Sequence, residues 1–265
     1  MDYFTTTSNA ARRAVDCVIV GIFDRGKLGV AAADIDAASN GALKRLYKRG
    51  DLSGQLGRCV VLNDLQGVRA PRVVVVGLGK VSKFSSRQFQ RALGVALGTV
   101  TQTRSKSVLN ALTLDTGDDA SAYYLGRHTA QAVGDALYRF TEMKSGKKKP
   151  GPALRQVGLS VVRRGDAKRA MRGAEHGDAI VEGMNLAKDL GNLPANVCTP
   201  SYIARTAQKL ARKHKKITAR ILNEAEMKRL GMHSLLSVPA GTKEPAKLIV
   251  LPVSYTHLTL PTITS

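Results

Sequence analysis

The chain has 265 residues, of which 43% are hydrophobic, and a formal net charge of +21 at pH 7. This composition is enough for one large or two small domain cores, and it excludes a membrane-spanning protein, because every apolar run is too short to cross a bilayer of ~30 Å. The three cysteines, Cys17, Cys59 and Cys198, have no C-x-x-C spacing, which argues against a disulfide framework or a zinc knot and predicts reduced, mostly buried thiols.

The first residues contain no basic region followed by a long apolar stretch, so we expect no secretory signal and a cytoplasmic location. The positive charge would attract polyanions, and the basic residues are densest at 144–172, with a second basic region at 209–229. However, aromatic residues make up only 5% of the chain, Trp is absent, and no nucleic-acid-binding module is recognisable. Nucleic-acid binding therefore remains the alternative function.

The N-terminal part alternates apolar strand patterns with amphipathic helix patterns, which is typical of an α/β sheet. In chain order the residues predict a strand at 17–23 with a hairpin partner at 27–30, a helix at 37–49, strands at 57–62 and 72–77, a helix at 85–100, a strand at 107–114, a helix at 120–140, a loop at 143–152, and a strand at 156–162. The β-branched run at 72–77 predicts a strand that is buried on both faces.

Gly77-Leu78-Gly79-Lys80 follows this strand and precedes a helix, so it matches half of a dinucleotide-binding fingerprint. The third glycine is missing, because Ser82 stands at its position, and no phosphate-binding P-loop occurs in the chain. We therefore interpret the segment as a tight strand-to-helix turn. Binding of an unidentified small ligand at the carboxyl ends of the strands is a third, weaker possibility.

Three acids, Asp115, Asp118 and Asp119, lie close to Gly117 and could suggest a metal site. The segment lacks the alternating ligand spacing and the terminal Glu of a calcium loop. We therefore expect solvated loop acids and charges at a helix start.

The segment 184–210 reads as a helix end, a constrained connector and a second helix start. Gly191 is expected to close the first helix in the left-handed conformation, and Thr199 is expected to cap a helix that has Pro200 at its first position. Beyond this helix the sequence predicts a strand at 217–221, a helix at 225–230 capped by Asn223 with Glu226 and closed by Gly231, and strands at 234–238 and 247–251.

The pattern N-L-A-K-D-L-x-N-x-P-x-N-x-x-T-P-x-Y-I-A at 185–204 closely resembles the entry to the catalytic domain of the leucyl aminopeptidase (cytosol aminopeptidase, peptidase M17) family. The segments V-V-V-V-G-L-G-K-x-x-K-F at 73–84, L-G-M-H-S-L-L-S-V at 230–238 and G-T-K-E-P-A-K-L-I-V-L at 241–251 are also similar to this family.

The resemblance implies an α/β protein with an N-terminal mixed-sheet, macro-like, three-layer domain at 1–170. A linker helix and connector would follow at 171–198, and the start of the catalytic domain at 199–252. It also implies a homohexamer that hydrolyses N-terminal residues from peptides with two divalent metal ions, zinc or manganese.

The residues of such a metal centre cannot be assembled from this sequence. A two-metal hydrolase needs several converging carboxylates, yet H-E-x-x-H is absent and the family's N-T-D-A-E-G-R motif does not occur. The histidines are isolated along the chain: His128, His176, His214, His233 and His257. We therefore assign no catalytic, cofactor-binding or metal residue, and expect this polypeptide to be inactive and to bind no metal.

The last residues, 253–265, leave the family pattern abruptly and resemble the translation of a sequencing adapter. We expect them to be a non-native tail and the natural reading frame to continue. The sequence thus predicts a fragment of a leucyl-type metalloaminopeptidase.

Overall fold

The computed structural model describes residues 1–116, 121–145 and 151–254. It divides into two compact units, unit 1 at Met1–Asn185 and unit 2 at Leu186–Ser265. The boundary lies inside the segment predicted as a linker. The predicted tail from residue 255 onward, like Asp118, Asp119 and residues 146–150 of the basic loop, lies outside the described residues.

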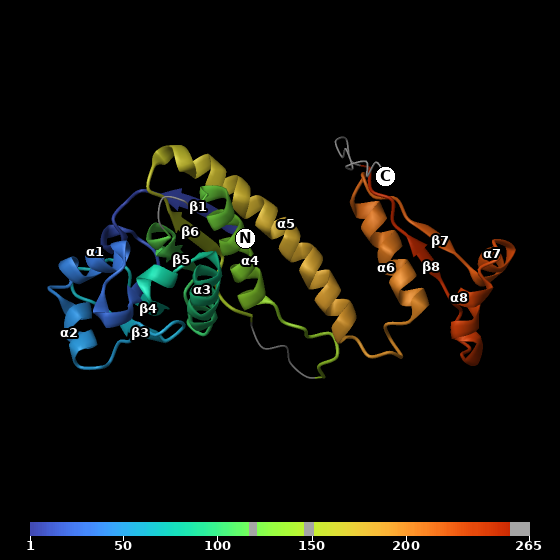
Figure 1. Ribbon diagram of the computed structural model, residues 1–265, viewed down its shortest axis with the longest axis horizontal. Helices are drawn as coiled ribbons and strands as arrows, with labels where there is room; N and C mark the ends of the chain where they lie inside the picture. Colours follow the sequence, from blue (N-terminus) through green and yellow to red (C-terminus); the bar gives the residue numbers. More distant parts are fainter. Residues whose placement is uncertain (117–120, 146–150, 255–265) are drawn as a thin grey trace. The chain divides into compact units, whose positions relative to one another are not determined.

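Unit 1 is built on a six-stranded mixed sheet (Figure 1). Its strand order is β1-β6-β5-β2-β4-β3, and every neighbouring pair is parallel except β3 and β4, which are antiparallel. The strands are β1 (Asp2–Thr6), β2 (Cys17–Phe23), β3 (Cys59–Asn63), β4 (Arg72–Gly79), β5 (Ser107–Asn110) and β6 (Gln156–Ser160). This confirms the predicted mixed α/β sheet.

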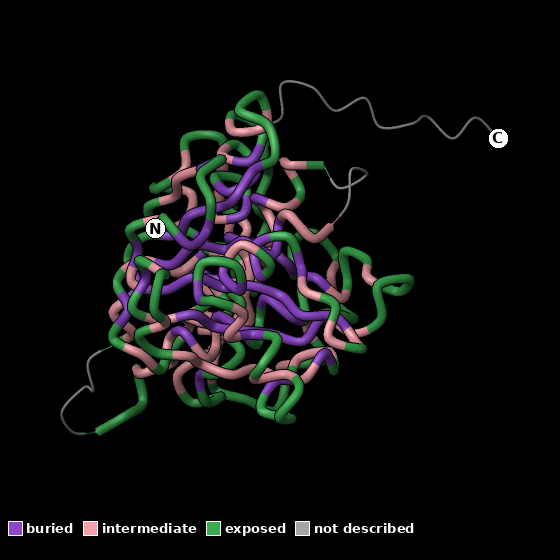
Figure 2. The backbone as a smooth tube through the Cα atoms, turned by 90° about the vertical axis from the view of Figure 1, so that its left-hand side faces the viewer, coloured by how far each residue is buried: buried purple, intermediate pink, exposed green. Residues whose placement is uncertain are grey.

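Helices cover both faces of this sheet, which gives three layers. The helices of unit 1 are α1 (Val30–Ala38), α2 (Ala42–Lys48), α3 (Ser86–Thr101), α4 (Ala122–Leu137) and α5 (Ala167–Asn192), the last of which ends within unit 2. Alternate β2 residues belong to two separate cores: Ile19 packs with α3 residues such as Phe89, whereas Val20 packs with α1 residues such as Ile35. The central strands are therefore buried on both faces, as predicted for β4 (Figure 2).

Two backbone N–H groups of the segment predicted as a turn, Gly77-Leu78-Gly79-Lys80, donate to protein carbonyls. The Gly77 N–H donates to the Arg58 carbonyl over 2.8 Å, and the Gly79 N–H donates to the Gly54 carbonyl over 2.7 Å. A Cβ at Gly77 would overlap with the Gln55 carbonyl, so glycine is needed for this close backbone approach. These glycines thus serve packing, but the predicted tight strand-to-helix turn was wrong, because β4 continues to Gly79 and α3 begins only at Ser86, after a 3-10 turn at Val81–Lys83.

Several local predictions in unit 1 were wrong. No strand forms at 27–30, because Arg25 and Gly26 adopt positive φ and only Leu28 makes a single bridge to Ile22 before α1 begins. The helix predicted at 37–49 is broken by the positive φ of Asn40 and Gly41 into α1 and α2. The strand predicted at 107–114 ends at Asn110 and continues as a 3-10 turn at Leu112–Asp115.

The edge strand β1 was missed. Its sequence is mixed rather than uniformly apolar, and its place in the sheet depends on a distant partner, β6. Tyr3 of β1 also donates a hydrogen bond of 2.7 Å to Asp178 of α5. Both contacts are long-range, so local sequence patterns could not reveal them.

Helices α4 and α5 pack closely through glycines. A Cβ at Gly126 of α4 would overlap with the Ala170 carbonyl, and a Cβ at Gly173 of α5 would overlap with the Tyr123 carbonyl. Gly177 faces Ala130 in the same seam. The absence of side chains lets the two helix backbones approach each other, which fixes α5 over α4.

Unit 2 contains α6 (Pro200–Lys213), β7 (Arg220–Leu222), α7 (Glu224–Arg229), α8 (His233–Ser237) and β8 (Leu248–Val250). β7 and β8 form a two-stranded antiparallel sheet. The predicted capping box of Asn223 with Glu226 is present, and Gly231 has a φ of +71° after α7. No helix in the described part of the chain is long and apolar enough to span a membrane.

Two predictions in unit 2 were wrong. Gly191 does not close its helix in the left-handed conformation, because α5 continues through Asn192. The residues predicted as a strand at 234–238 lie mostly in α8, where the Leu236 N–H donates to the Met232 carbonyl. A short apolar run does not distinguish a strand from a helical turn.

Candidate functional site

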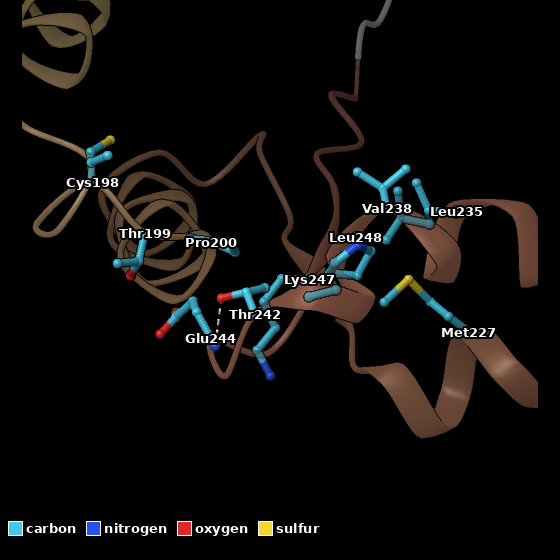
Figure 3. A pocket seen from close by; sticks show the side chains of 13 residues that line it. Cys198, Thr199, Pro200, Met227, Leu235, Val238, Thr242, Glu244, Lys247 and Leu248 are labelled. Atoms are coloured by element: carbon cyan, nitrogen blue, oxygen red, sulfur yellow. Dashed lines mark hydrogen bonds between the residues drawn. The ribbon is translucent and has the colours of Figure 1, made fainter.

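The largely apolar cavity of unit 2 has a volume of about 500 Å³. Figure 3 shows the side chains of Met227, Leu235, Val238 and Leu248 gathered at one end of it, with Glu244 and Thr199 at the other. We call this cavity the unit 2 pocket; it is also lined by Ala195, Cys198, Pro200, Pro239, Thr242, Ala246 and Lys247.

The polar end of the unit 2 pocket is the N-terminus of α6. The Thr199 side chain accepts a hydrogen bond of 3.3 Å from the Tyr202 N–H, and Pro200 occupies the first helical position, as the sequence predicted. Glu244 Oε1 accepts a second hydrogen bond, of 3.2 Å, from the Ser201 N–H. Two donors that a helix start leaves unpaired are thus satisfied by side chains from different segments.

The Glu244 carboxylate serves as a helix cap in this arrangement. Hydrogen bonds from Ser201 hold the pKa of Glu244 below its ordinary value, so the group is ionised at neutral pH. Its own backbone N–H donates to Thr242 Oγ1 over 3.1 Å, which fixes the loop (Figure 3). Sequence reasoning missed this role because Glu244 is distant from α6 in the chain.

The cysteines differ in burial, which partly agrees with the expectation of mostly buried thiols. Cys17 is fully buried in β2, and burial raises its pKa to about 12. Cys59 and Cys198 are partly buried, and burial also raises the pKa of Cys59. All three thiols are free.

Among the residues that the structure describes, the histidines do not share a metal site. His128 lies on α4 within 3.4 Å of both Gln90 Nε2 and Gln131 Oε1, and burial lowers its pKa. His176 lies on α5, where its Nδ1 is 2.8 Å from the Tyr123 hydroxyl. His214 follows α6, His233 begins α8, and His257 lies outside the described residues.

Both histidines on α4 and α5 have aromatic neighbours that our sequence analysis did not identify. Tyr124 stacks on His128, Tyr123 contacts His176 edge-on, and the two tyrosine rings contact each other with centroids 5.3 Å apart. His128 also lines a cavity of about 600 Å³, whose lining from α3, α4 and α5 mixes polar and apolar residues. Adjacent tyrosines at a helix start would have been the only sequence signal for this cluster.

Asp115 is not the solvated loop acid that we expected. Its Oδ1 accepts a hydrogen bond of 2.7 Å from the Val30 N–H at the start of α1, whereas its Oδ2 is buried and has no hydrogen-bond partner. The carboxyl group lies against Gly21 and Gly29, where an added Cβ would collide with it. Burial raises the pKa of Asp115 to about 7, against the smaller lowering effect of the Val30 hydrogen bond.

The described residues do not fit a two-metal centre. Among residues 1–116, 121–145 and 151–254, no three His, Cys, Asp or Glu side chains lie close enough together to hold a metal ion. A bridged pair of cations needs several carboxylates that converge on one point. No residue of this part of the chain is therefore assigned as a metal ligand.

Comparison with known families identifies both parts of the chain. Residues 19–147 match the model of the cytosol aminopeptidase family's N-terminal domain, and residues 185–259 match the model of the same family's catalytic domain. The second match extends a few residues into the segment predicted as a non-native tail.

Curated relatives give the same assignment. A probable cytosol aminopeptidase of Halorhodospira halophila is 37% identical over 252 residues, which cover 95% of this chain and 50% of the relative. A probable cytosol aminopeptidase of Paraburkholderia xenovorans is 40% identical over 236 residues, covering 89% and 46%. The chain thus spans about half the length of the curated relatives that it matches.

Solved structures share the fold. A mutant of tomato leucine aminopeptidase superposes with a TM-score of 0.80 at 24% identity, covering 95% of this chain and 50% of that one. The bottromycin maturation enzyme BotP in complex with Mn superposes with a TM-score of 0.68 at 25% identity, covering 90% and 45%. With two domain models matched in order along the sequence, the chain belongs to the cytosol aminopeptidase family.

Proposed function

We propose that the protein to which this chain corresponds is a leucyl-type metalloaminopeptidase that hydrolyses N-terminal amino acids from peptides by a two-metal mechanism. The observation that carries this proposal is the match of one chain to both the N-terminal and the catalytic domain of a single peptidase family. The relatives from Halorhodospira and Paraburkholderia, which are named as aminopeptidases, support it.

The chain's own contribution to this function is a scaffold. Unit 1 provides a three-layer domain with two buried cores, and unit 2 provides the first elements of the catalytic domain. Because the described residues supply no metal-binding set, we derive no chemical step from them and expect residues 1–265 alone to be inactive.

Three further properties are proposed from the family alone. We propose that the metal ions are zinc or manganese, that the whole protein is a homohexamer, and that it acts in the cytoplasm. The manganese in the BotP structure supports the choice of metal, and the family's name supports the location. Native mass spectrometry of the whole protein would measure both subunit number and bound metal.

The experiment that tests the activity compares two proteins. The uninterrupted reading frame of the gene, purified with Mn²⁺ or Zn²⁺, should release the chromophore from a leucyl anilide, and a chelator should abolish this release. The chain 1–265, assayed at the same concentration, should stay at background. Chelator-sensitive turnover by 1–265 would contradict the scaffold assignment, and an inactive full reading frame would contradict the proposed activity.

Nucleic-acid binding is the alternative raised by the basic composition, and the comparisons do not support it; in unit 2 it would depend on exposed basic residues of α6. Arg205, Lys209 and Arg212 are exposed on α6 at i, i+4 and i+7, so they form one basic stripe. If this stripe binds phosphates, affinity for duplex DNA should fall steeply between 50 and 200 mM salt. If no binding of duplex DNA above background is detected at 50 mM salt, the basic stripe is a solvated surface that does not bind nucleic acid.

A further inference from the structure

The cavity of about 600 Å³ that His128 lines lies in unit 1, against α3, α4 and α5. α4 packs with α3 in one hydrophobic core and with α5 through the glycine seam, so the three helices lie side by side (Figure 1). The volume is in the range of small-molecule sites. We call this cavity the α4 pocket; its polar lining consists of Gln90 and Arg91 of α3 and of His128, Gln131 and Asp135 of α4.

The polar groups of α4 form a row along one face of the helix. His128, Gln131 and Asp135 are spaced at i, i+3 and i+7, which places them on the same side of α4. At ~1.5 Å per residue, the row extends over about 10 Å of the helix axis. Polar contacts that are spread along a line suit an elongated ligand rather than a single ion.

Two side-chain amides flank the imidazole ring of His128. Gln90 Nε2 lies 3.4 Å from His128 Nε2, and Gln131 Oε1 lies 3.4 Å from His128 Nδ1. Both separations are longer than a typical hydrogen bond, so these groups engage one another weakly. Each primary amide offers donors and an acceptor, which complement the C=O and the N–H of a peptide group.

The charged groups of the α4 pocket balance one another. Arg91 and Asp135 are both exposed and carry opposite charges, and burial lowers the pKa of His128, so its ring is uncharged at neutral pH. The described lining thus has no net charge and favours neither a simple anion nor a simple cation. A zwitterion matches this lining, because a guanidinium binds a carboxylate through two parallel hydrogen bonds and a carboxylate accepts from an ammonium group.

The remaining lining leaves room for an apolar group. Gly94 of α3 and Ala132 and Ala136 of α4 are small, and Met184 of α5 contributes a flexible thioether chain. Within the described part of the chain, a Cβ built on Gly94 would have no neighbour within 4 Å beyond its own stretch of helix. A ligand side chain of moderate size therefore has a surface to pack on beside the polar row.

We propose that the α4 pocket binds a short unblocked peptide in its zwitterionic form. Arg91 holds the terminal carboxylate, and Asp135 holds the terminal ammonium group. The amides of Gln90 and Gln131 bond the peptide groups between these ends. A free amino acid has no peptide group and would leave both amides unpaired, whereas a sugar would leave the two charges unpaired. The proposal rests on the lining of the pocket and is independent of the proposed function.

The test is calorimetric titration of the chain 1–265 with the tripeptide leucyl-glycyl-glycine. A chelator is present throughout, so that metal-dependent hydrolysis cannot consume the probe. We expect saturable one-to-one binding of the tripeptide. Free leucine, and the tripeptide blocked at both ends, should each bind about tenfold more weakly or less, because the first loses the amide contacts and the second loses the charge-assisted hydrogen bonds. Maltose should not bind above background.

Two pairs of variants locate the bound tripeptide. Gly94→Leu places a side chain in the α4 pocket and should weaken binding by about tenfold or more, whereas Gly98→Leu, on the same helix but outside the described lining, should leave it unchanged. Arg91→Gln removes the guanidinium and should weaken binding by about tenfold. Arg87→Gln is its control, because Arg87 is exposed one turn earlier on α3 and lies outside the described lining. Thermal unfolding of each variant verifies that it is folded.

Several results would overturn the proposal. These are the absence of saturable tripeptide binding, and equal affinity for free leucine, the blocked tripeptide or maltose. Tripeptide binding that survives Gly94→Leu would also overturn it, because the peptide would then occupy another place. Peptidase activity is measured separately: tripeptide binding by 1–265 together with an inactive full reading frame supports the α4 pocket and contradicts the proposed function. An active full reading frame without tripeptide binding by 1–265 does the reverse.

Discussion

The Asp115 carboxyl group caps α1 from a distant part of the chain, because its Oδ1 accepts a hydrogen bond of 2.7 Å from the Val30 N–H, 85 residues earlier. The second oxygen, Oδ2, is buried without a hydrogen-bond partner. A carboxylate at a helix start is normally stabilised by the helix dipole. Here the cost of burying the charge is larger, and the pKa rises from 3.8 to about 7.

This raised pKa predicts how stability depends on pH. The folded protein holds the Asp115 proton more tightly than the unfolded chain, so the contribution of Asp115 to the free energy of unfolding should fall as pH rises from about 4 to about 7 and change little above that. Asp115→Asn keeps an oxygen that can accept from Val30 and carries no charge. We expect it to flatten this pH dependence and to stabilise the protein at pH 8, by at most ~4 kcal/mol.

The measurement is urea unfolding between pH 4 and 8. Asp51→Asn is the control, because Asp51 forms an exposed ion pair with Arg49 and should contribute little to stability. If Asp115→Asn retains the pH dependence of the unaltered protein, Asp115 is not the group that titrates.

The α4–α5 seam predicts opposite effects for two glycines of the same helix. A Cβ at Gly173 would overlap with the Tyr123 carbonyl, so Gly173→Ala must push the helices apart and should cost roughly 1–3 kcal/mol. Gly183 lies on an exposed part of α5 with nothing within 4 Å of an added Cβ, so Gly183→Ala should stabilise the protein by up to ~1 kcal/mol.

Thermal unfolding of the two variants checks this pair of effects. Lowering of the melting temperature by Gly173→Ala together with an unchanged or raised value for Gly183→Ala is expected. Equal effects of the two substitutions would mean that α4 and α5 are not closely packed.

The success of the sequence-based predictions depended on the range of the interactions involved. The buried strand β2 and the capping box of Asn223 with Glu226 follow from neighbouring residues, and both were predicted. The helix α8 was predicted as a strand, because an apolar run of its length fits either structure. Local rules are strongest where a chain segment determines its own conformation.

The candidate sites show the same division. Thr199 was predicted as the cap of α6, but Glu244, which caps the same helix, was not. The environment of Asp115 is created by Gly21 and Gly29, which no sequence pattern connects to it. Both misses are contacts between segments that only the fold brings together.

The start of α6 offers a last test, because its cap was predicted from sequence and is present in the structure. Thr199→Ala removes the side chain that accepts from the Tyr202 N–H and should destabilise the helix start by about 1 kcal/mol. The Tyr202 amide should then exchange with solvent about fivefold faster, because that free energy governs local opening. Thr199→Ser retains the hydroxyl and should keep exchange close to that of the unaltered protein. Equal exchange in the alanine and serine variants would show that Glu244, through Ser201, is sufficient to hold the helix start, and that the Thr199 hydroxyl adds nothing.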